Sequence, residues 1–316
     1  MSGYLGLDTS NYTTSAAYWA AGEALPVQKK QLLPVKAGEM GLRQSDAVFH
    51  HVRQLPDMLE GLQEAMVGGV SAVAASDRPQ QKDGSYMPCF LVGAGAARQL
   101  GAALGVPTYF FTHQQGHVAA ALLGADCLPL RRRPFLAFHV SGGTTDGLLV
   151  QPDDTCIIRC EVVARSLDLK AGQLIDRVGG LLGLPFPAGP ALERLAAEAQ
   201  QTYKPKATLR GCDCHLSGVE NQCRDRLQRG EPPAEVARFC LDSVRAAVEG
   251  MTEAMLATYG DLPVVYAGGV MSNTMLKECL TARFGGRFAP PAFSADNAAG
   301  IACLCRLAQE EGYPCR

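Results

Sequence analysis

The sequence predicts an α/β protein built from two related domains, and two observations support this. An apolar strand, a polar turn and a second strand occur near residue 1 and again near residue 135. The turns align as Ser10-Asn-Tyr-Thr-Thr14 and Ser141-Gly-Gly-Thr-Thr145, which indicates a duplicated unit. A length of 316 residues also suits two domains with ample buried core. We therefore expect one domain at residues 1–133 and a second at residues 134–316.

The elements follow from the spacing of apolar residues along the chain. In the first half we expect strands at Gly3 to Asp8, Ser15 to Trp19, Val70 to Ala75 and Val106 to Phe111, with helices at Leu42 to Met66 and Phe90 to Leu104. In the second half we expect strands at Phe135 to Val140, Gly147 to Val150, Cys156 to Val163 and Val264 to Tyr266, and helices beginning near Leu169, Pro190, His215 and Ser272. A helical stripe from Val236 to Met255 indicates a long helix with one core-facing side.

Composition and charge narrow the class of protein. Apolar residues make up 47% and charged residues 19%, which is ordinary for a globular protein. A net charge of -2 provides no general field for nucleic acid, so any RNA contact must be local. The one tight basic run, Arg131-Arg132-Arg133, is expected to be a solvated loop. Residues 99–125 lack charged side chains, but Pro107 and several polar residues interrupt them, so they predict no membrane span.

The twelve cysteines are scattered along the chain. None forms Cys-x-x-Cys and no secretory signal precedes them, so we expect reduced thiols and a cytoplasmic protein. Cys212-Asp-Cys214-His215 together with Cys223 could be drawn as a zinc site, although the spacing is poor.

A pair of histidines carries the strongest chemical signal. His113 and His117 lie in Thr112-His-Gln-Gln-Gly-His117, between a predicted strand and a predicted helix. On a helix their spacing places both imidazoles on one face, where they can share a divalent metal. Such a pair needs a third ligand, and Asp296 is the best candidate. Two imidazoles and a carboxylate suit Fe, Zn or Mn.

The residues between the histidines argue against a metalloprotease. Gln114 and Gln115 stand where a zinc protease carries its catalytic Glu, so no general base for peptide hydrolysis lies between the ligands.

Glycine-rich turns indicate a nucleotide site. Backbone N–H groups after a strand can approach phosphate where side chains are small. The residues expected to bind nucleotide in this way are Ser141, Gly142, Gly143, Gly268, Gly269 and Asn273, together with the Thr9 to Thr14 turn. Asp176 is a further candidate, because its carboxylate could accept hydrogen bonds from ribose hydroxyls. The sequence has neither a Walker lysine motif nor G-x-G-x-x-G, so P-loop and Rossmann binding are not supported.

Taken in order, these residues resemble the tRNA threonylcarbamoyladenosine transferase (TsaD) family, once named O-sialoglycoprotein endopeptidases. The resemblance runs from Gly3 to about Arg306. It covers Leu5-Gly-Leu-Asp-Thr-Ser10, His51-Val-Arg53, His113-x3-His117, Val140-Ser-Gly-Gly143, Asp176, Gly189, Ser217-Gly218, Ala267-Gly-Gly-Val-x2-Asn273 and Asp296-Asn297. It implies the duplicated fold of actin, Hsp70 and sugar kinases (ASKHA), with nucleotide held in an interdomain cleft.

The resemblance also implies an activity, cofactors and partners. Family members transfer threonylcarbamoyl from its adenylate to the exocyclic amine of the tRNA adenosine next to the anticodon. His113, His117 and Asp296 would hold a divalent metal, and Asp176 and Gly189 match positions that contact ribose. A shorter paralogue of the TsaB type, or a second copy, would pair through the first helices.

The chain departs from the family pattern on the acceptor side, and this leaves alternatives open. The departures are Asn11-Tyr12-Thr13 in place of Cys and paired acids, Ser76-Asp-Arg-Pro79 in place of a Gly-Pro-Gly loop, Thr144 in place of His, Leu169 and Gln173 in place of acids, and the added Lys170. A divergent paralogue that transfers a carbamoyl-type group to another acceptor is one alternative. A non-catalytic partner that binds ATP or ADP is the second.

Overall fold

The computed structural model describes residues 2–10, 12–34, 42–294 and 298–315. The chain forms two compact units. Unit 1 comprises Met1–Arg133, Val150–Cys160 and Ala292–Arg316, and unit 2 comprises Pro134–Leu149 and Glu161–Pro291. This differs from a simple division at residue 133, because the last helix packs on the first sheet and a hairpin tip is held by side chains of unit 1.

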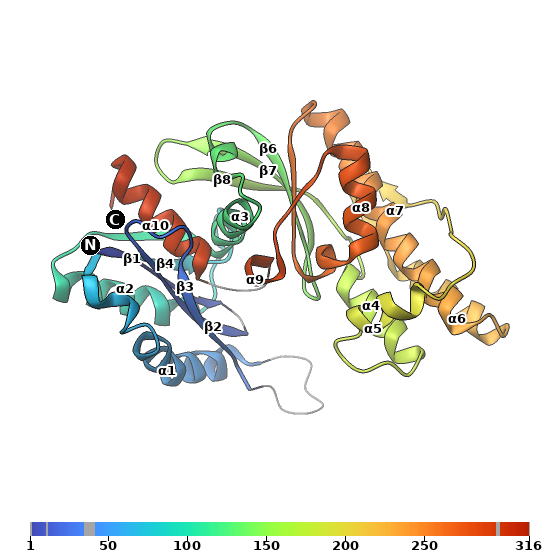
Figure 1. The fold of residues 1–316 in the computed structure, drawn as a ribbon, viewed down its shortest axis with the longest axis horizontal. Helices are drawn as coiled ribbons and strands as arrows, with labels where there is room; N and C mark the ends of the chain where they lie inside the picture. Colours follow the sequence, from blue (N-terminus) through green and yellow to red (C-terminus); the bar gives the residue numbers. More distant parts are fainter. Residues whose placement is uncertain (1, 11, 35–41, 295–297, 316) are drawn as a thin grey trace. The chain divides into compact units, whose positions relative to one another are not determined.

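A five-stranded sheet with the order β3-β2-β1-β4-β5 forms the centre of unit 1 (Figure 1). Its strands are β1 (Gly3–Ser10), β2 (Thr13–Ala20), β3 (Val27–Leu32), β4 (Val70–Arg78) and β5 (Thr108–Thr112). β1 runs antiparallel to β2 and parallel to β4, and β5 continues the parallel set. The expected strand-turn-strand opening is therefore present, and the carboxyl ends of β1, β4 and β5 meet at one edge. Polar side chains at that edge can act on one ligand.

Helices cover both faces of this sheet. Gly93 of α2 (Phe90–Leu104) lies against Thr9, whereas Gly6 lies against Ala302 of α10 (Ala299–Glu311). Residues 6 and 9 point to opposite faces of β1, so α2 and α10 lie on opposite sides. α1 (Gln44–Glu60) joins α2, and α3 (His113–Gly124) joins α10. α1 is shorter than the expected helix, because the chain leaves it at Gly61 and forms a separate short turn, η1 (Ala65–Gly68).

A second five-stranded sheet, with the order β12-β11-β6-β7-β8, forms the centre of unit 2 (Figure 1). Its strands are β6 (Phe135–Val140), β7 (Thr145–Asp153), β8 (Ile157–Arg165), β11 (Val264–Ala267) and β12 (Arg287–Phe288). The helices of this half are α4 (Ala171–Leu181), α5 (Gly189–Ala196), α6 (Ser217–Gln228), α7 (Pro233–Tyr259), α8 (Thr274–Phe284) and α9 (Pro291–Ser294). The buried stripe of α7 forms the centre of an apolar cluster with α4, α5, α6 and β6. The long helix therefore serves as core, as its pattern predicts.

The strands that the sequence pattern missed are short or polar. β3 reads Val-Gln-Lys-Lys-Gln-Leu and is largely exposed, so it lacks the apolar alternation of a half-buried strand. β9 (Thr208–Arg210), β10 (Asp213–His215) and β12 have three residues or fewer. Their pairing is set by the surrounding fold rather than by local sequence.

Three further expectations concern cysteines, charge and hydropathy. Ten of the cysteines are free thiols, at positions 156, 160, 212, 214, 223, 240, 279, 303, 305 and 315. Within the described ranges, no helix combines the length and the apolar character that a membrane crossing requires. Arg131 is not the solvated residue that its basic run suggests, because it is buried and paired with Glu311.

Candidate functional site

Helix α3 begins abruptly at His113, at the carboxyl end of β5. Thr112 caps it: its hydroxyl accepts from the Gln115 backbone N–H at 3.1 Å, and its own N–H donates to the Gln115 side-chain oxygen at 2.7 Å. This reciprocal cap satisfies N–H groups that a helix start leaves without partners. The strand-to-helix junction expected around the histidines is therefore present.

The two imidazoles converge, as expected for a shared ligand. His113 Nε2 and His117 Nε2 lie 2.8 Å apart, and the rings meet edge to face at 4.2 Å between centroids. Two nitrogens bound to one metal at about 2.0–2.1 Å each lie roughly 3 Å apart. The distance between the two nitrogens is that of a hydrogen bond between the imidazoles, and the same two nitrogens could hold a divalent metal.

A buried carboxylate orients the first of these rings. Asp8, at the end of β1, is 1% exposed, and its Oδ2 lies 2.7 Å from His113 Nδ1. Its Oδ1 accepts from Ser10 N–H at 3.0 Å and from the Ser76 hydroxyl at 2.9 Å. A carboxylate on Nδ1 fixes the tautomer that leaves Nε2 for the metal and raises its basicity. Asp8 was not among the site residues predicted from sequence, since its partner lies 105 residues away.

The third predicted metal ligand, Asp296, lies outside the described residues. Within the described part of the chain, no group of three or more His, Cys, Asp and Glu side chains has metal-binding geometry. This includes the alternative zinc set at Cys212, Cys214, His215 and Cys223. Cys214 is buried there, and burial raises the pKa of its thiol to about 11, which opposes the thiolate that zinc requires.

In unit 2, the Ser141–Thr145 turn leaves room for a ligand. The Ser141 N–H closes the turn by donating to the Thr144 carbonyl at 2.8 Å. A side chain added at Gly142 or Gly143 would meet nothing within 4 Å, so the backbone faces open space. The first turn of α4 supports it from the other side, where Ala171 N–H donates to the Thr145 hydroxyl at 2.9 Å. A phosphate can approach such a backbone closely.

The second glycine loop follows β11 in the same unit. Gly268 has a φ of 102°, and an added Cβ would collide with the backbone of Val140, so only glycine fits. Gly269 faces open space. Asn273 is 8% exposed and caps α8, its Oδ1 accepting from the Leu276 N–H at 3.0 Å. The Asn273 oxygen is thus used by the helix, and its amide N–H groups are the part that can serve an adenosine.

Asp176 and Gly189 lie together in this half of the chain. Asp176 Oδ1 accepts from the Ala188 N–H at 2.8 Å, which fixes the loop that leads into α5 at Gly189. One carboxylate oxygen therefore holds the loop, and the ribose contact predicted for Asp176 requires the other.

The charged residues Asp146, Asp168 and Lys170 form a cluster that the sequence did not predict. The cluster lies beside Leu169 and Gln173, the positions at which the family pattern has acids. Burial would raise the pKa of Asp168, but hydrogen bonds from the N–H groups of Leu216, Leu169 and Ser217 hold it well below its usual range. Lys170 Nζ donates to the Ser166 carbonyl at 2.8 Å. Burial raises the pKa of Asp146, and the nearby Lys170 and Arg165 act in the opposite direction.

A buried histidine in α1 predicts an acid-sensitive stability. His51 is fully buried, its Nδ1 lies 2.8 Å from the Thr14 hydroxyl, and burial lowers its pKa to about 4. An unfolded chain takes up this proton near pH 6.5, whereas the folded protein does so only near pH 4. We therefore expect the contribution of His51 to be complete above pH 6.5 and to fall by about 3 kcal/mol as the pH drops to 4.

Urea unfolding of wild type and His51→Gln between pH 4.5 and 7.5 measures this effect. The expected result is a flatter pH dependence in the variant. His50→Gln, which replaces a neighbouring partly exposed histidine, should keep the wild-type slope. Equal slopes in all three proteins would contradict the assignment.

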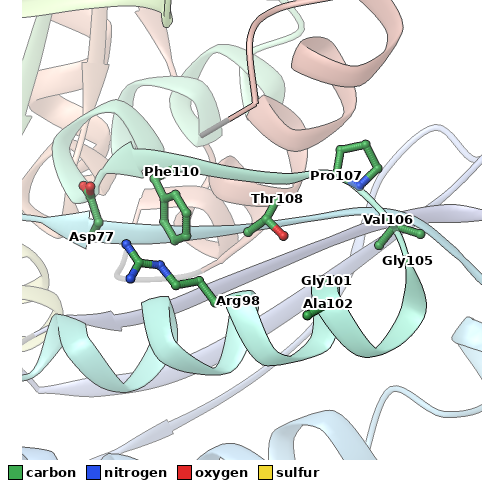
Figure 2. Close-up of a pocket in the computed structure, with 9 residues that line it drawn as sticks. All are labelled: Asp77, Arg98, Gly101, Ala102, Gly105, Val106, Pro107, Thr108 and Phe110. Carbon is green, nitrogen blue, oxygen red and sulfur yellow. The ribbon is translucent and has the colours of Figure 1, made fainter.

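A groove between α2 and β5 lies apart from these residues (Figure 2). It has a volume of about 700 Å³ and is lined by Asp77, Arg98, Gly101, Ala102, Gly105, Val106, Pro107, Thr108 and Phe110. The Arg98 guanidinium lies over the Phe110 ring, 5.3 Å from its centroid. None of the residues predicted to bind metal or nucleotide lines the groove, so it is not part of the candidate site.

Comparison with solved structures identifies the fold class of the protein. Full-length HypF, solved in a phosphate- and nucleotide-bound form, matches 98% of this chain and 56% of its own at 12% identity and a TM-score of 0.60. A ROK hexokinase from Thermus thermophilus matches 98% of this chain and all of its own at 20% identity and a TM-score of 0.50. The fold is therefore the ASKHA fold of actin and the sugar kinases, as expected.

The family follows from sequence. The family model described as TsaD: tRNA N6-adenosine threonylcarbamoyltransferase matches residues 38–303. A curated relative of that name from Methanopyrus kandleri is 32% identical over 92% of this chain and 83% of its own length. One from Thermus thermophilus is 31% identical over 98% of this chain and 94% of its own. The chain belongs to the TsaD family of carbamoyltransferases, which confirms the resemblance.

Proposed function

We propose that the protein transfers a threonylcarbamoyl group from its adenylate to the N6 amine of the tRNA adenosine next to the anticodon. The observation that carries the proposal is the convergence of His113 and His117 within a chain of this family. In the reaction the N6–carbon bond forms and the bond from the carbonyl carbon to the phosphate oxygen breaks, so AMP leaves. The amine nitrogen loses one proton as the bond forms, and this proton passes to water.

His113 and His117 are proposed to hold a divalent metal, with Asp296 as the third ligand. A metal there would supply Lewis-acid and template chemistry for an anionic substrate. Asp8 keeps Nδ1 of His113 engaged at 2.7 Å, so Nε2 stays directed at the partner imidazole. Two imidazoles and a carboxylate suit Fe, Zn or Mn.

Nucleotide binding is proposed for residues of unit 2. The turn at Ser141, Gly142 and Gly143 would bind the phosphate. A backbone hydrogen bond closes the turn, and the space beside its two glycines is unoccupied by other atoms of the protein. The Asn273 amide and the Gly268–Gly269 backbone would contact adenosine, and Asp176 with Gly189 the ribose. Gly268 supports this role indirectly, because its close approach to Val140 fixes where the loop lies.

The proposed partner is a shorter paralogue of the TsaB type, or a second copy, that docks on the first helices. Phe49 and Val52 of α1 are each 56% exposed, and Leu91 of α2 is 58% exposed. Exposed large apolar side chains of this kind are typical of a surface that a partner protein covers. We place the enzyme in the cytoplasm, where free cysteines are ordinary.

The test is transfer in vitro. Purified protein, unmodified tRNA and threonylcarbamoyl-adenylate, with and without the TsaB-type partner, should yield threonylcarbamoyladenosine in the tRNA. Absence of product under both conditions, while adenylate binds, would contradict the proposal.

A second candidate is transfer of a carbamoyl-type group to another acceptor. Lys170 favours it, because this residue introduces a cation beside Asp146 where the family pattern has no lysine. Tight adenylate binding without tRNA modification would favour this candidate. A non-catalytic ATP- or ADP-binding partner is the third, and turnover that disappears in His117→Ala would exclude it.

A further inference from the structure

A small polar pocket lies in the loop that follows β4. It has a volume of about 380 Å³ and is lined by Arg78, Gln81, Lys82, Asp83, Gly84 and Ser85. Two of these side chains are cationic and one is a carboxylate, so positive charge prevails among the lining residues. Guanidinium, ammonium and hydroxyl groups are the side-chain groups with which proteins bind phosphate and carboxylate oxygens. The composition of the pocket therefore indicates a site for an oxyanion.

Contacts within the protein hold the pocket in shape. The Ser85 hydroxyl accepts from the Gln80 N–H at 3.0 Å, which closes the loop across the pocket. Gln81 ties the loop to β8, because its Oε1 accepts from the Cys160 N–H at 2.7 Å. Gly84 has a φ of 73°, and an added Cβ there would meet nothing within 4 Å. The protein itself therefore sets the shape of the turn, and the space beside the turn is open.

Both cations of the pocket are accessible to a ligand. Arg78 pairs with its neighbour Asp77 at 3.4 Å, and the two side chains are 37% and 24% exposed. An ion pair in contact with water contributes little to stability, so a bound anion can replace Asp77 at low cost. The β4–β5 ladder shifts register between Ser76 and Arg78, and such a bulge redirects side chains at the end of a strand. Lys82 is exposed.

The loop of the pocket borders the start of α3, which carries the histidine pair. Arg78 pairs with Thr112 in the β4–β5 ladder, and Thr112 precedes His113. Neighbouring strands lie about 4.8 Å apart and successive Cα atoms about 3.8 Å, so the Cα atoms of Arg78 and His113 lie within about 9 Å of each other. The loop also contacts the helix directly, since the Gln114 N–H donates to the Pro79 carbonyl at 3.1 Å. The pocket is therefore close enough to the histidine pair for one large substrate to reach both.

The charge of the chain favours RNA as the source of the anion. A net charge of -2 requires that any contact with RNA be local. The tight basic run offers less than its sequence suggests, because Arg131 is buried and both Arg131 and Arg132 pair with Glu311. The loop of the pocket stands in place of the family's Gly-Pro-Gly loop, on the acceptor side of the site. Arg, Lys and Ser side chains are ordinary contacts of nucleic-acid phosphates, so the pocket fits the acceptor RNA.

We propose that Arg78 and Lys82 bind a backbone phosphate of the tRNA and so position the anticodon loop beside the histidine pair. Contacts to phosphate fix the position of a nucleic acid without reading its sequence. The pocket therefore contributes to tRNA affinity, and the rate at saturating tRNA does not depend on it. This inference rests on the proposed function, because it takes tRNA as the acceptor.

The test measures binding of labelled, unmodified tRNA by fluorescence anisotropy at several salt concentrations, with the TsaB-type partner present. Arg78→Met removes the charge and keeps an apolar stem. It should weaken binding by about fivefold and lower the slope of log affinity against log salt by about one, and Lys82→Met should act in the same direction. Arg78→Lys keeps the charge and should keep the wild-type slope. Lys30→Met is the control and should change neither quantity, because it removes an exposed lysine of β3 at the opposite edge of the sheet.

The outcomes separate this inference from the proposed function. Wild-type affinity and slope in both Arg78→Met and Lys82→Met would overturn the inference, and transfer by wild type would leave the proposed function standing. A raised KM for threonylcarbamoyl-adenylate with unchanged tRNA binding would also overturn it, because the pocket would then bind the carboxylate of the donor. Wild type that binds tRNA and transfers nothing contradicts the proposed function alone, and wild type that binds no tRNA overturns both. Weaker tRNA binding with a lower slope and an unchanged kcat at saturating tRNA would support the inference.

Discussion

Replacement of His117 by alanine is expected to abolish metal binding and to reduce transfer by about 1,000-fold, equivalent to about 4 kcal/mol in the barrier. The reason is geometric: His117 Nε2 lies 2.8 Å from His113 Nε2, and removing it leaves one imidazole for the metal. Metal content by mass spectrometry and single-turnover transfer measure the two effects. Thermal stability should change little, because the imidazole is a partly buried group at a surface of unit 1 rather than core.

His50→Ala is the matched control. It removes a histidine from α1, outside the converging pair, and should retain full metal content. Metal content and turnover at wild-type levels in His117→Ala would show that the pair does not hold the metal. If His117→Ala lost its metal and kept normal turnover, the metal would not be needed for the transfer reaction.

Gly300→Ala is expected to have the largest effect on stability, about 3 kcal/mol, with a fall of about 10 °C in Tm. A Cβ at this position would collide with the backbone carbonyl of Gly116 and lie 2.9 Å from the Ala120 nitrogen. Helices α3 and α10 therefore touch backbone to backbone, so an added methyl group could be accommodated only if one helix shifted away from the other. Because α3 carries the histidine pair, metal affinity should fall as well.

Gly95→Ala provides the contrast within unit 1. Gly95 also lies in a helix, α2, but an added Cβ there meets nothing within 4 Å. Alanine should stabilise this helix by roughly 0.5–1 kcal/mol. Thermal unfolding of both variants tests the packing directly, and a neutral Gly300→Ala would contradict the close contact of α3 with α10.

Much of the fold follows from local pattern. Phe90–Leu104 is helical over the range that its apolar spacing predicts, and the two strand-turn-strand openings are present. The division into units could not be predicted in the same way. The apolar pattern of α10 shows that it is buried, but only tertiary packing decides that it lies on the first sheet.

The same distinction applies to the candidate site. The His113–His117 spacing is local, so the sequence predicts the convergence that the structure shows. Asp8 and Gln115 act over long range, and nothing near them in the sequence indicates their partners. The nucleotide residues and Asp296 stay predictions, which ligand binding must test.

The most direct test of the central proposal is tRNA nucleoside mass spectrometry in bacteria depleted of their own transferase and supplied with this gene. The account predicts that threonylcarbamoyladenosine returns with the wild-type gene and is absent with His117→Ala. Co-expression of the TsaB-type partner of the gene's own source controls for partner mismatch. Wild-type protein that accumulates with its partner and still leaves the tRNA unmodified would contradict transfer to tRNA.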